Sequence, residues 1–133
     1  MLLVDTGVIL GLLNSADDWH QRCVDLSRSP QWEPLVPTTV LVEVDYMLRK
    51  YFRPGWKGFF EDVKDGLYVI EVVNSLDCAR AIDLCMQYPT MQFCDATVIA
   101  IAERKRMATV ATTDRRDFCL VTPKHCQAFN LVP

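Results

Sequence analysis

Short apolar runs alternate with longer amphipathic segments over the whole chain. The apolar runs have the length and the β-branched or aromatic character of buried strands. We therefore expect five strands, at 2–5, 34–37, 67–73, 108–113 and 129–132.

The segments between these runs repeat their apolar positions at helical spacing. They predict helices at 6–14, 17–29, 38–52, 55–66, 75–89 and 94–107. Residues that favour helix N-caps stand at the start of three of these segments. They are Asp17 or Asp18, Thr38 or Thr39, and Ser75. The alternation of strands and helices predicts an α/β layered fold with a mostly parallel sheet.

The length of the chain sets the scale of this fold. With 133 residues, of which 50% are hydrophobic, the chain can bury a substantial core. No linker or break in composition divides it. We expect a single domain over residues 1–133.

The charge of the chain is mildly acidic but unevenly distributed. The formal net charge is −3, which by itself does not indicate a nucleic-acid-binding protein. Between residues 103 and 124, however, six basic residues stand against three acidic ones. The basic residues are Arg104, Lys105, Arg106, Arg115, Arg116 and Lys124. This local excess is compatible with a rim that faces phosphates.

The beginning of the chain does not resemble a secretory signal. No basic segment precedes the first apolar run, and Asp5 interrupts that run. No window is apolar enough to span a bilayer. We expect a soluble cytoplasmic protein that has no membrane partner. The six cysteines form no C-x-x-C pair, so we expect buried, reduced thiols and keep a structural zinc site only as the minor alternative.

Four acidic residues stand in unusual places. Asp5 and Asp114 each end an apolar strand run, and function in open α/β sheets gathers at the carboxyl ends of strands. Glu43 lies in the apolar stretch VLVEV, and Asp95 stands at the head of a nearly all-apolar helix. We expect these four carboxylates to meet at one edge of the sheet.

Each acid also has a purely structural interpretation. Asp5 can cap the helix that follows it, and Asp95 can be the N-cap of its own helix. Asp114 can be a turn residue, and Glu43 can point outward to solvent. As a set these interpretations are weaker, because four neighbouring carboxylates repel one another.

A divalent cation is the simplest compensation for such a cluster. Oxygen-only ligands select Mg²⁺ or Mn²⁺, and such an ion activates water and neutralises phosphoryl oxygens. We therefore expect a metal-dependent phosphodiester hydrolase that uses the four acids. Arg115 and Arg116 are candidates to hold flanking phosphates, although a solvated turn explains each equally well. Thr6 and Thr112 are candidates to hydrogen-bond a ligand carboxylate, a metal-bound water or a phosphate, with local capping as the alternative.

The segments around the four acids resemble, in order, the PIN domain family, in particular the ribonuclease toxins of VapC-type toxin–antitoxin pairs. The matching segments are LLVDTGVIL (2–10), VLVEVDYML (40–48) and CDATVIAIAERKRMATVATTDRRDF (94–118). The resemblance extends over essentially the whole chain.

The resemblance implies a three-layer α/β/α sandwich with an acidic pocket for Mg²⁺ or Mn²⁺. The family's acidic quartet corresponds to Asp5, Glu43, Asp95 and Asp114. The hydroxyl that precedes its last acid corresponds to Thr112. A further acid, which we expect outside the first ligand sphere, corresponds to Asp117. The resemblance also implies cleavage of structured RNA such as tRNA or rRNA to leave a 5′-phosphate, silencing by a cognate antitoxin, and a homodimer.

Other functions remain as alternatives. One is a non-catalytic PIN-like domain that binds RNA or protein, and another is a housekeeping nuclease of RNA maturation. A haloacid-dehalogenase-type phosphatase also begins with a strand that ends in Asp, but it needs a second Asp where this chain has Gly7.

Overall fold

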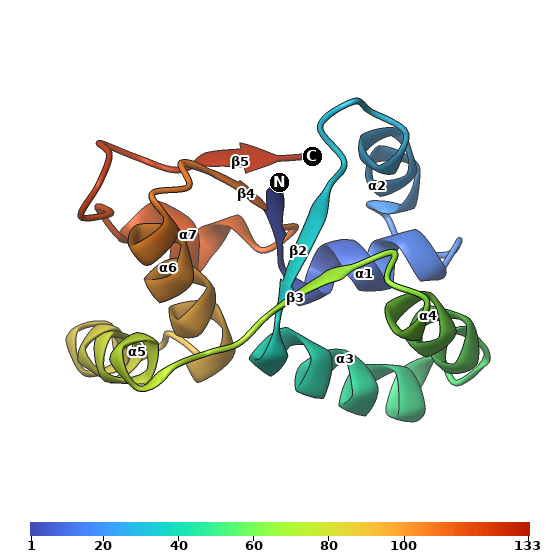
Figure 1. Ribbon diagram of the computed structural model, residues 1–133, viewed down its shortest axis with the longest axis horizontal. Helices are drawn as coiled ribbons and strands as arrows, with labels where there is room; N and C mark the ends of the chain where they lie inside the picture. Colours follow the sequence, from blue (N-terminus) through green and yellow to red (C-terminus); the bar gives the residue numbers. More distant parts are fainter.

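The computed structural model describes residues 1–133 and contains five strands and seven helices (Figure 1). The strands are β1 (Leu2–Val4), β2 (Pro34–Pro37), β3 (Val69–Glu71), β4 (Thr109–Ala111) and β5 (Asn130–Val132). The helices are α1 (Thr6–Leu13), α2 (His20–Ser27), α3 (Thr38–Tyr51), α4 (Pro54–Lys64), α5 (Ser75–Gln87), α6 (Phe93–Lys105) and α7 (Arg115–Leu120).

All five strands are parallel, in the order β3-β2-β1-β4-β5. After β1, the chain adds β2 and then β3 on one side of β1. It then crosses back and adds β4 and β5 on the other side. Because parallel crossovers are right-handed, this reversal puts the two sets of helices on opposite faces. The reversal lies between β1 and β4, and a crevice at such a point is the usual place for a ligand.

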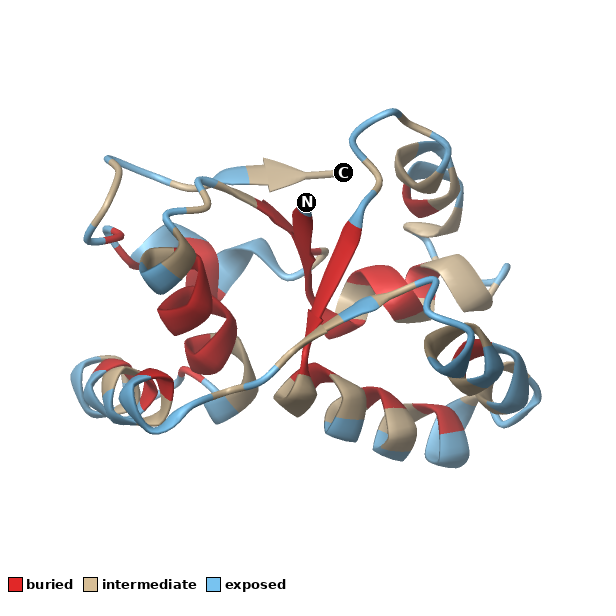
Figure 2. Cartoon of the chain, in the orientation of Figure 1, coloured by how far each residue is buried: buried red, intermediate tan, exposed pale blue.

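The molecule has three layers, as predicted. Helices α1 to α4 lie on one side of the sheet and α5 to α7 on the other (Figure 1). The central strands and the inward faces of the helices form one core of 24 buried apolar residues (Figure 2). Strand β1 is wholly buried, which explains why its sequence is a continuous apolar run. None of the helices is both long and apolar enough to cross a membrane.

The predicted strands and helices all exist, with shifted ends and different caps. Thr38 does not cap α3, because its Oγ1 accepts a hydrogen bond from the distant Val73 N–H. Helix α5 is capped by Asn74 instead of Ser75, and Asp77 completes a capping box with it. Helix α7 was not predicted, because six residues are too few to show a period.

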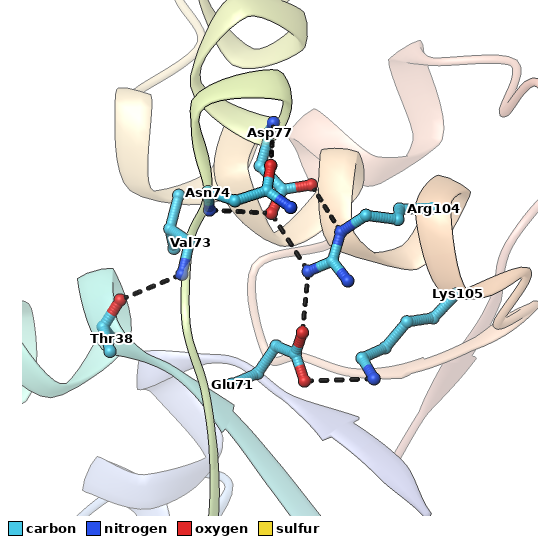
Figure 3. A network of polar contacts seen from close by, with 7 residues as sticks. All are labelled: Thr38, Glu71, Val73, Asn74, Asp77, Arg104 and Lys105. Carbon is cyan, nitrogen blue, oxygen red and sulfur yellow. Dashed lines mark hydrogen bonds and ion pairs between the residues drawn. The ribbon is translucent and has the colours of Figure 1, made fainter.

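Two residues of the predicted basic rim are neutralised inside the fold (Figure 3). The Arg104 guanidinium donates to both oxygens of Asp77, at 2.8 and 3.0 Å, and to Glu71 at 2.7 Å. Lys105 pairs with the second oxygen of Glu71 at 3.0 Å. These cations join α6 to α5 and β3, so the expectation that they face phosphates is wrong.

All six thiols are free, but only Cys23 is fully buried.

Candidate metal and catalytic site

Acidic side chains from several elements converge on one cavity at the carboxyl ends of the strands. The cavity has a volume of about 190 Å³. Its eleven lining residues include all four acids of the predicted quartet. They are Asp5, Thr6, Gly7, Leu10, Glu43, Met47, Gln92, Asp95, Asp114, Arg116 and Asp117.

Different elements carry the four acids into this cavity. Asp5 follows β1, and Asp114 comes three residues after β4, on the two strands that flank the reversal of the sheet. Glu43 lies on α3, which follows β2 directly. Asp95 lies in the first turn of α6, on the other face of the sheet. The expectation that the four meet at one edge is therefore confirmed.

The tightest cluster includes Asp117, which was expected only outside the first ligand sphere. Carboxylate oxygens of Asp95, Asp114 and Asp117 all lie within 4.8 Å of one another. Asp117 is 1% exposed, and neither of its oxygens has a hydrogen-bond partner. Asp114 and Asp117 are three residues apart at the start of α7, so both reach the same face of this helix. Recognising α7 in the sequence would have predicted their pairing.

Two hydrogen bonds orient the Asp5 carboxylate. Its Oδ1 accepts from the Thr6 backbone N–H at 2.8 Å, and its Oδ2 accepts from the Thr112 hydroxyl at 2.9 Å. Asp5 and Thr112 are both buried, so this pair is shielded from solvent. Thr112 therefore binds a carboxylate of the site, and the local alternative holds as well, because its Oγ1 accepts a hydrogen bond from the Asp114 backbone N–H at 3.1 Å. Thr6 lines the cavity with a buried hydroxyl that has no partner.

The structural interpretations apply to only some of the acids. Asp5 does cap α1, and Asp114 caps α7 by accepting from the Arg116 N–H at 3.2 Å. Asp95 is not a cap, because α6 begins at Phe93 and its N-cap is Gln92. Glu43 lines the cavity as well. Capping therefore does not explain why these carboxylates gather.

Burial and mutual repulsion disfavour the ionised form of the deepest acids. Burial, opposed by the two hydrogen bonds, raises the pKa of Asp5 to about 6. Burial, followed by the negative charge of Asp5 and of Asp117, raises the pKa of Asp95 well above its ordinary value. The metal-free site therefore holds negative charge at a cost in free energy.

The donor set fits a hard divalent cation. The three clustered aspartates offer only carboxylate oxygens, and the two oxygens of Asp117, which accept no hydrogen bond, lie near those of Asp95 and Asp114. Oxygen-only sites of this kind are typical of Mg²⁺ or Mn²⁺. Asp117 has only the largely exposed Arg116 guanidinium, 3.4 Å from its Oδ1, as a counter-charge, so a bound cation would complete the compensation of the buried acids.

Gly7 allows two parts of the site to approach closely. A Cβ atom at this position would collide with the Thr113 side chain. Thr113 lies in the turn that carries Thr112 and Asp114, so the missing side chain lets that turn close over the start of α1.

The two arginines after Asp114 lie in different surroundings. Arg116 lines the cavity, with its Nε 3.4 Å from Asp117 Oδ1 and most of its side chain exposed. Arg115 does not line the cavity. It donates a hydrogen bond to the carbonyl of Pro133 and lies 5.8 Å from the centre of the Trp19 ring.

Comparison with known proteins gives a family and a full-length relative. The family model of the PIN domain matches residues 2–122. Ribonuclease VapC26 of Mycobacterium tuberculosis (strain ATCC 25618 / H37Rv) is 23% identical over 140 residues, which cover 99% of this chain and all of that protein.

Similar solved structures share the fold at 18% sequence identity. VapC20 of Mycobacterium tuberculosis, described as a toxin that cleaves the sarcin–ricin loop, superposes with a TM-score of 0.78 over 88% of this chain and 92% of its own. A toxin–antitoxin complex from Klebsiella pneumoniae superposes with a TM-score of 0.70, over 100% of this chain and 97% of that chain. FitAcB from Neisseria gonorrhoeae superposes with a TM-score of 0.69, over 98% of this chain and 97% of that chain.

Proposed function

The chain belongs to the PIN domain family, and we propose that it is a metal-dependent endoribonuclease, the toxin of a toxin–antitoxin pair. The observation that carries the proposal is the convergence of Asp95, Asp114 and Asp117 in one cavity beside Asp5 and Glu43. The ribonuclease name of the full-length relative supports the same activity. Structured RNA, such as tRNA or rRNA, is the proposed substrate, which places the activity in the cytoplasm.

The acidic residues of the cavity would bind the metal ion. Asp95, Asp114 and Asp117 would hold Mg²⁺ or Mn²⁺, with Asp5 and Glu43 as further ligands or water-binding groups. The bound ion supplies charge that neutralises a phosphoryl oxygen and lowers the pKa of water.

Side chains around the acids would hold the substrate and orient the ligands. Thr112 fixes the Asp5 carboxylate, and the free Thr6 hydroxyl offers a hydrogen bond to a water or a phosphate. Arg116 at the exposed side of the cavity would hold a phosphate oxygen. Arg115 points toward the end of the chain, so we propose only a supporting role for it in RNA binding.

Two partners belong to the proposal. A cognate antitoxin is supported by the toxin–antitoxin complex among the similar structures. A homodimer is supported by an apolar hollow beside Glu43, whose lining includes Val42, Phe93 and Cys94. Val42 is 71% exposed and Phe93 44%, so an association surface is available there.

The first test is the cleavage of total cellular RNA by the purified protein with Mg²⁺, with Mn²⁺ and with EDTA. We expect discrete fragments that require the metal. Asp95→Asn and Asp117→Asn should each lower the rate about 100-fold or more, because each removes a charged oxygen ligand. The exposed Asp18→Asn is the matched control and should cleave normally.

Calorimetric titration with Mn²⁺ gives a readout that does not depend on activity. Wild type should bind the ion, and Asp95→Asn should bind it weakly while melting at the same or a higher temperature without metal. A folded Asp95→Asn protein that retains metal-dependent cleavage would contradict the proposal. Wild-type protein with neither Mn²⁺ binding nor cleavage would favour a non-catalytic binding domain.

A further inference from the structure

Basic side chains gather at the junction of α3 and α4, and two of the four have no acidic partner. Four of the fourteen Lys and Arg residues lie within residues 49–57, and this segment has no acid. They are Arg49, Lys50, Arg53 and Lys57. Arg49 and Lys57 pair with exposed acids one helical turn away, at 2.7 and 3.7 Å, whereas no acid pairs with Lys50 or Arg53. This contrasts with Arg104 and Lys105, whose charges are bound within the fold.

Lys50 is held between two exposed tyrosines. Its Nζ donates a hydrogen bond to the Tyr46 hydroxyl at 3.2 Å and lies 5.0 Å from the centre of the Tyr51 ring. Tyr46 also lines the hollow that we assign to the homodimer, so Tyr51, which is 67% exposed, is the ring that stays open for a base. A cation beside open aromatic faces is the combination that binds a nucleic-acid strand, since the cation takes a phosphate and the ring stacks with a base.

A groove lies between the Tyr51 ring, which Lys50 contacts, and the acidic cavity. It has a volume of about 180 Å³ and is lined by Leu10, Asn14, Asp17, Met47, Leu48, Tyr51 and Phe52. Leu10 and Met47 also line the acidic cavity, so the two hollows adjoin each other across these side chains. Most of this lining is apolar, which suits the flat faces of bases better than a charged ligand.

The spacing along α3 matches a strand that runs through both hollows. Glu43 and Lys50 are seven residues apart, which is about two turns and about 10.5 Å along the same helix face. At the axial spacing of about 3.4 Å per nucleotide in one stacked strand, this is about three nucleotides. In Figure 1, α3 runs from the end of β2 out to α4.

From these observations, and resting on the proposed nuclease function, we propose an RNA subsite along α3. A single RNA strand leaves the acidic cavity over Leu10 and Met47, stacks a base on Tyr51, and binds a phosphate about three nucleotides from the scissile bond at Lys50. The subsite positions the strand and takes no part in the chemistry.

The test measures RNA affinity in an Asp95→Asn background with EDTA, so that the probe is not cut. The probe is a fluorescein-labelled, single-stranded RNA of mixed sequence, and anisotropy gives Kd over a series of salt concentrations. Lys50→Ala should reduce the slope of log Kd against log salt by about 0.7, the value for one phosphate contact to a single strand. Lys50→Arg should retain the slope. Lys64→Ala, an exposed helical lysine on the far end of α4, is the matched control.

Tyr51 provides an independent second readout. Tyr51→Ala should weaken binding about tenfold without changing the salt slope, because a stacking contact carries no charge. Tyr51→Phe keeps the ring and should bind normally. In the active protein, Lys50→Ala should raise KM and leave kcat unchanged, as expected for a group that binds ground state and transition state equally.

The outcomes separate the subsite from the function on which it rests. If RNA binds in a salt-dependent way but the Lys50→Ala slope equals that of Lys64→Ala, the subsite is overturned and the nuclease proposal stands. The α3 surface would then belong to a protein partner. If the Asp95→Asn protein binds no RNA and wild type cleaves none, both proposals fall.

Discussion

At the scale of single residues, the site depends on carboxylates that are placed where ionisation is unfavourable. Asp5 keeps two hydrogen bonds, yet burial still raises its pKa to about 6. Asp117 has no hydrogen-bond donor for either oxygen. A chain that only needed a stable core would place apolar or hydrogen-bonded groups here, so these residues fit a role in binding a cation.

The raised pKa of Asp5 predicts how stability depends on pH without metal. Its folded pKa, about 6, lies above the ordinary value of 3.8, so the folded state binds the proton more tightly. The associated stability is fully present below about pH 4 and is lost as pH rises through 6. We expect this group to lower the free energy of unfolding by about 3 kcal/mol across that window.

Urea unfolding in EDTA at a series of pH values checks this prediction. Asp5→Asn should flatten the profile between pH 4 and 6, whereas the exposed Asp18→Asn should leave it unchanged. Adding Mn²⁺ at pH 7 should raise the melting temperature of wild type, because the ion binds the deprotonated acids. Parallel profiles for wild type and Asp5→Asn would show that Asp5 ionises normally.

At the scale of elements, short segments carry the site and a carboxylate–guanidinium network holds them together. Helix α7 has only six residues, yet it brings Asp114 and Asp117 to the cavity. Helix α6 carries Asp95 at one end and Arg104 near the other, where it is tied to α5 and β3 (Figure 3). The network therefore fixes the far end of the helix that presents Asp95.

Removing Arg104 should destabilise the fold measurably. Arg104→Gln leaves Asp77, whose side chain is 2% exposed, and Glu71 without their main cation. We expect a loss of about 1–3 kcal/mol, below the value for a fully buried pair because the Arg104 side chain is about one-third exposed.

Urea unfolding at pH 7 measures this loss. Lys57→Ala breaks only an exposed pair with Glu61 and should change stability by no more than about 0.5 kcal/mol. Arg104→Gln should also leave the salt dependence of RNA binding unchanged, because its charge is already occupied. Equal stability of the two variants would mean that the network contributes little.

At the scale of the whole molecule, the acidic net charge and the proposed RNA substrate are compatible because charge is segregated. The acids gather at one cavity, two cations are neutralised by the network, and free basic charge lies along α3 and α4. The apolar hollow beside Glu43 adds a surface for association next to the same cavity.

The hollow predicts the effect of a charge on assembly. Val42→Glu should shift a dimer toward monomer in sedimentation velocity, because it puts a carboxylate into an apolar contact. Val42 is exposed in the isolated chain, so the variant should fold normally. Leu67→Glu, at another exposed apolar position, is the control and should remain associated. A wild-type protein that is monomeric at all concentrations would contradict the homodimer.

The sequence alone determined the order of strands and helices and the four acids of the predicted quartet. It could do so because buried parallel strands are continuous apolar runs, and an acid at the end of such a run stands out. The parallel arrangement then brings strand ends to one edge, so Asp5 and Asp114 were predictable as neighbours.

Only the tertiary structure decided which other charges serve the site and which hold the fold together. Arg104 meets partners that lie 27 and 33 positions away in the chain, and Asp117 enters the cavity through a helix too short to show a period. Tyr51, the ring beside Lys50, lines a groove that two separate helices form. Charge pairing and groove lining depend on contacts between segments distant in sequence, and local periodicity carries no information about them.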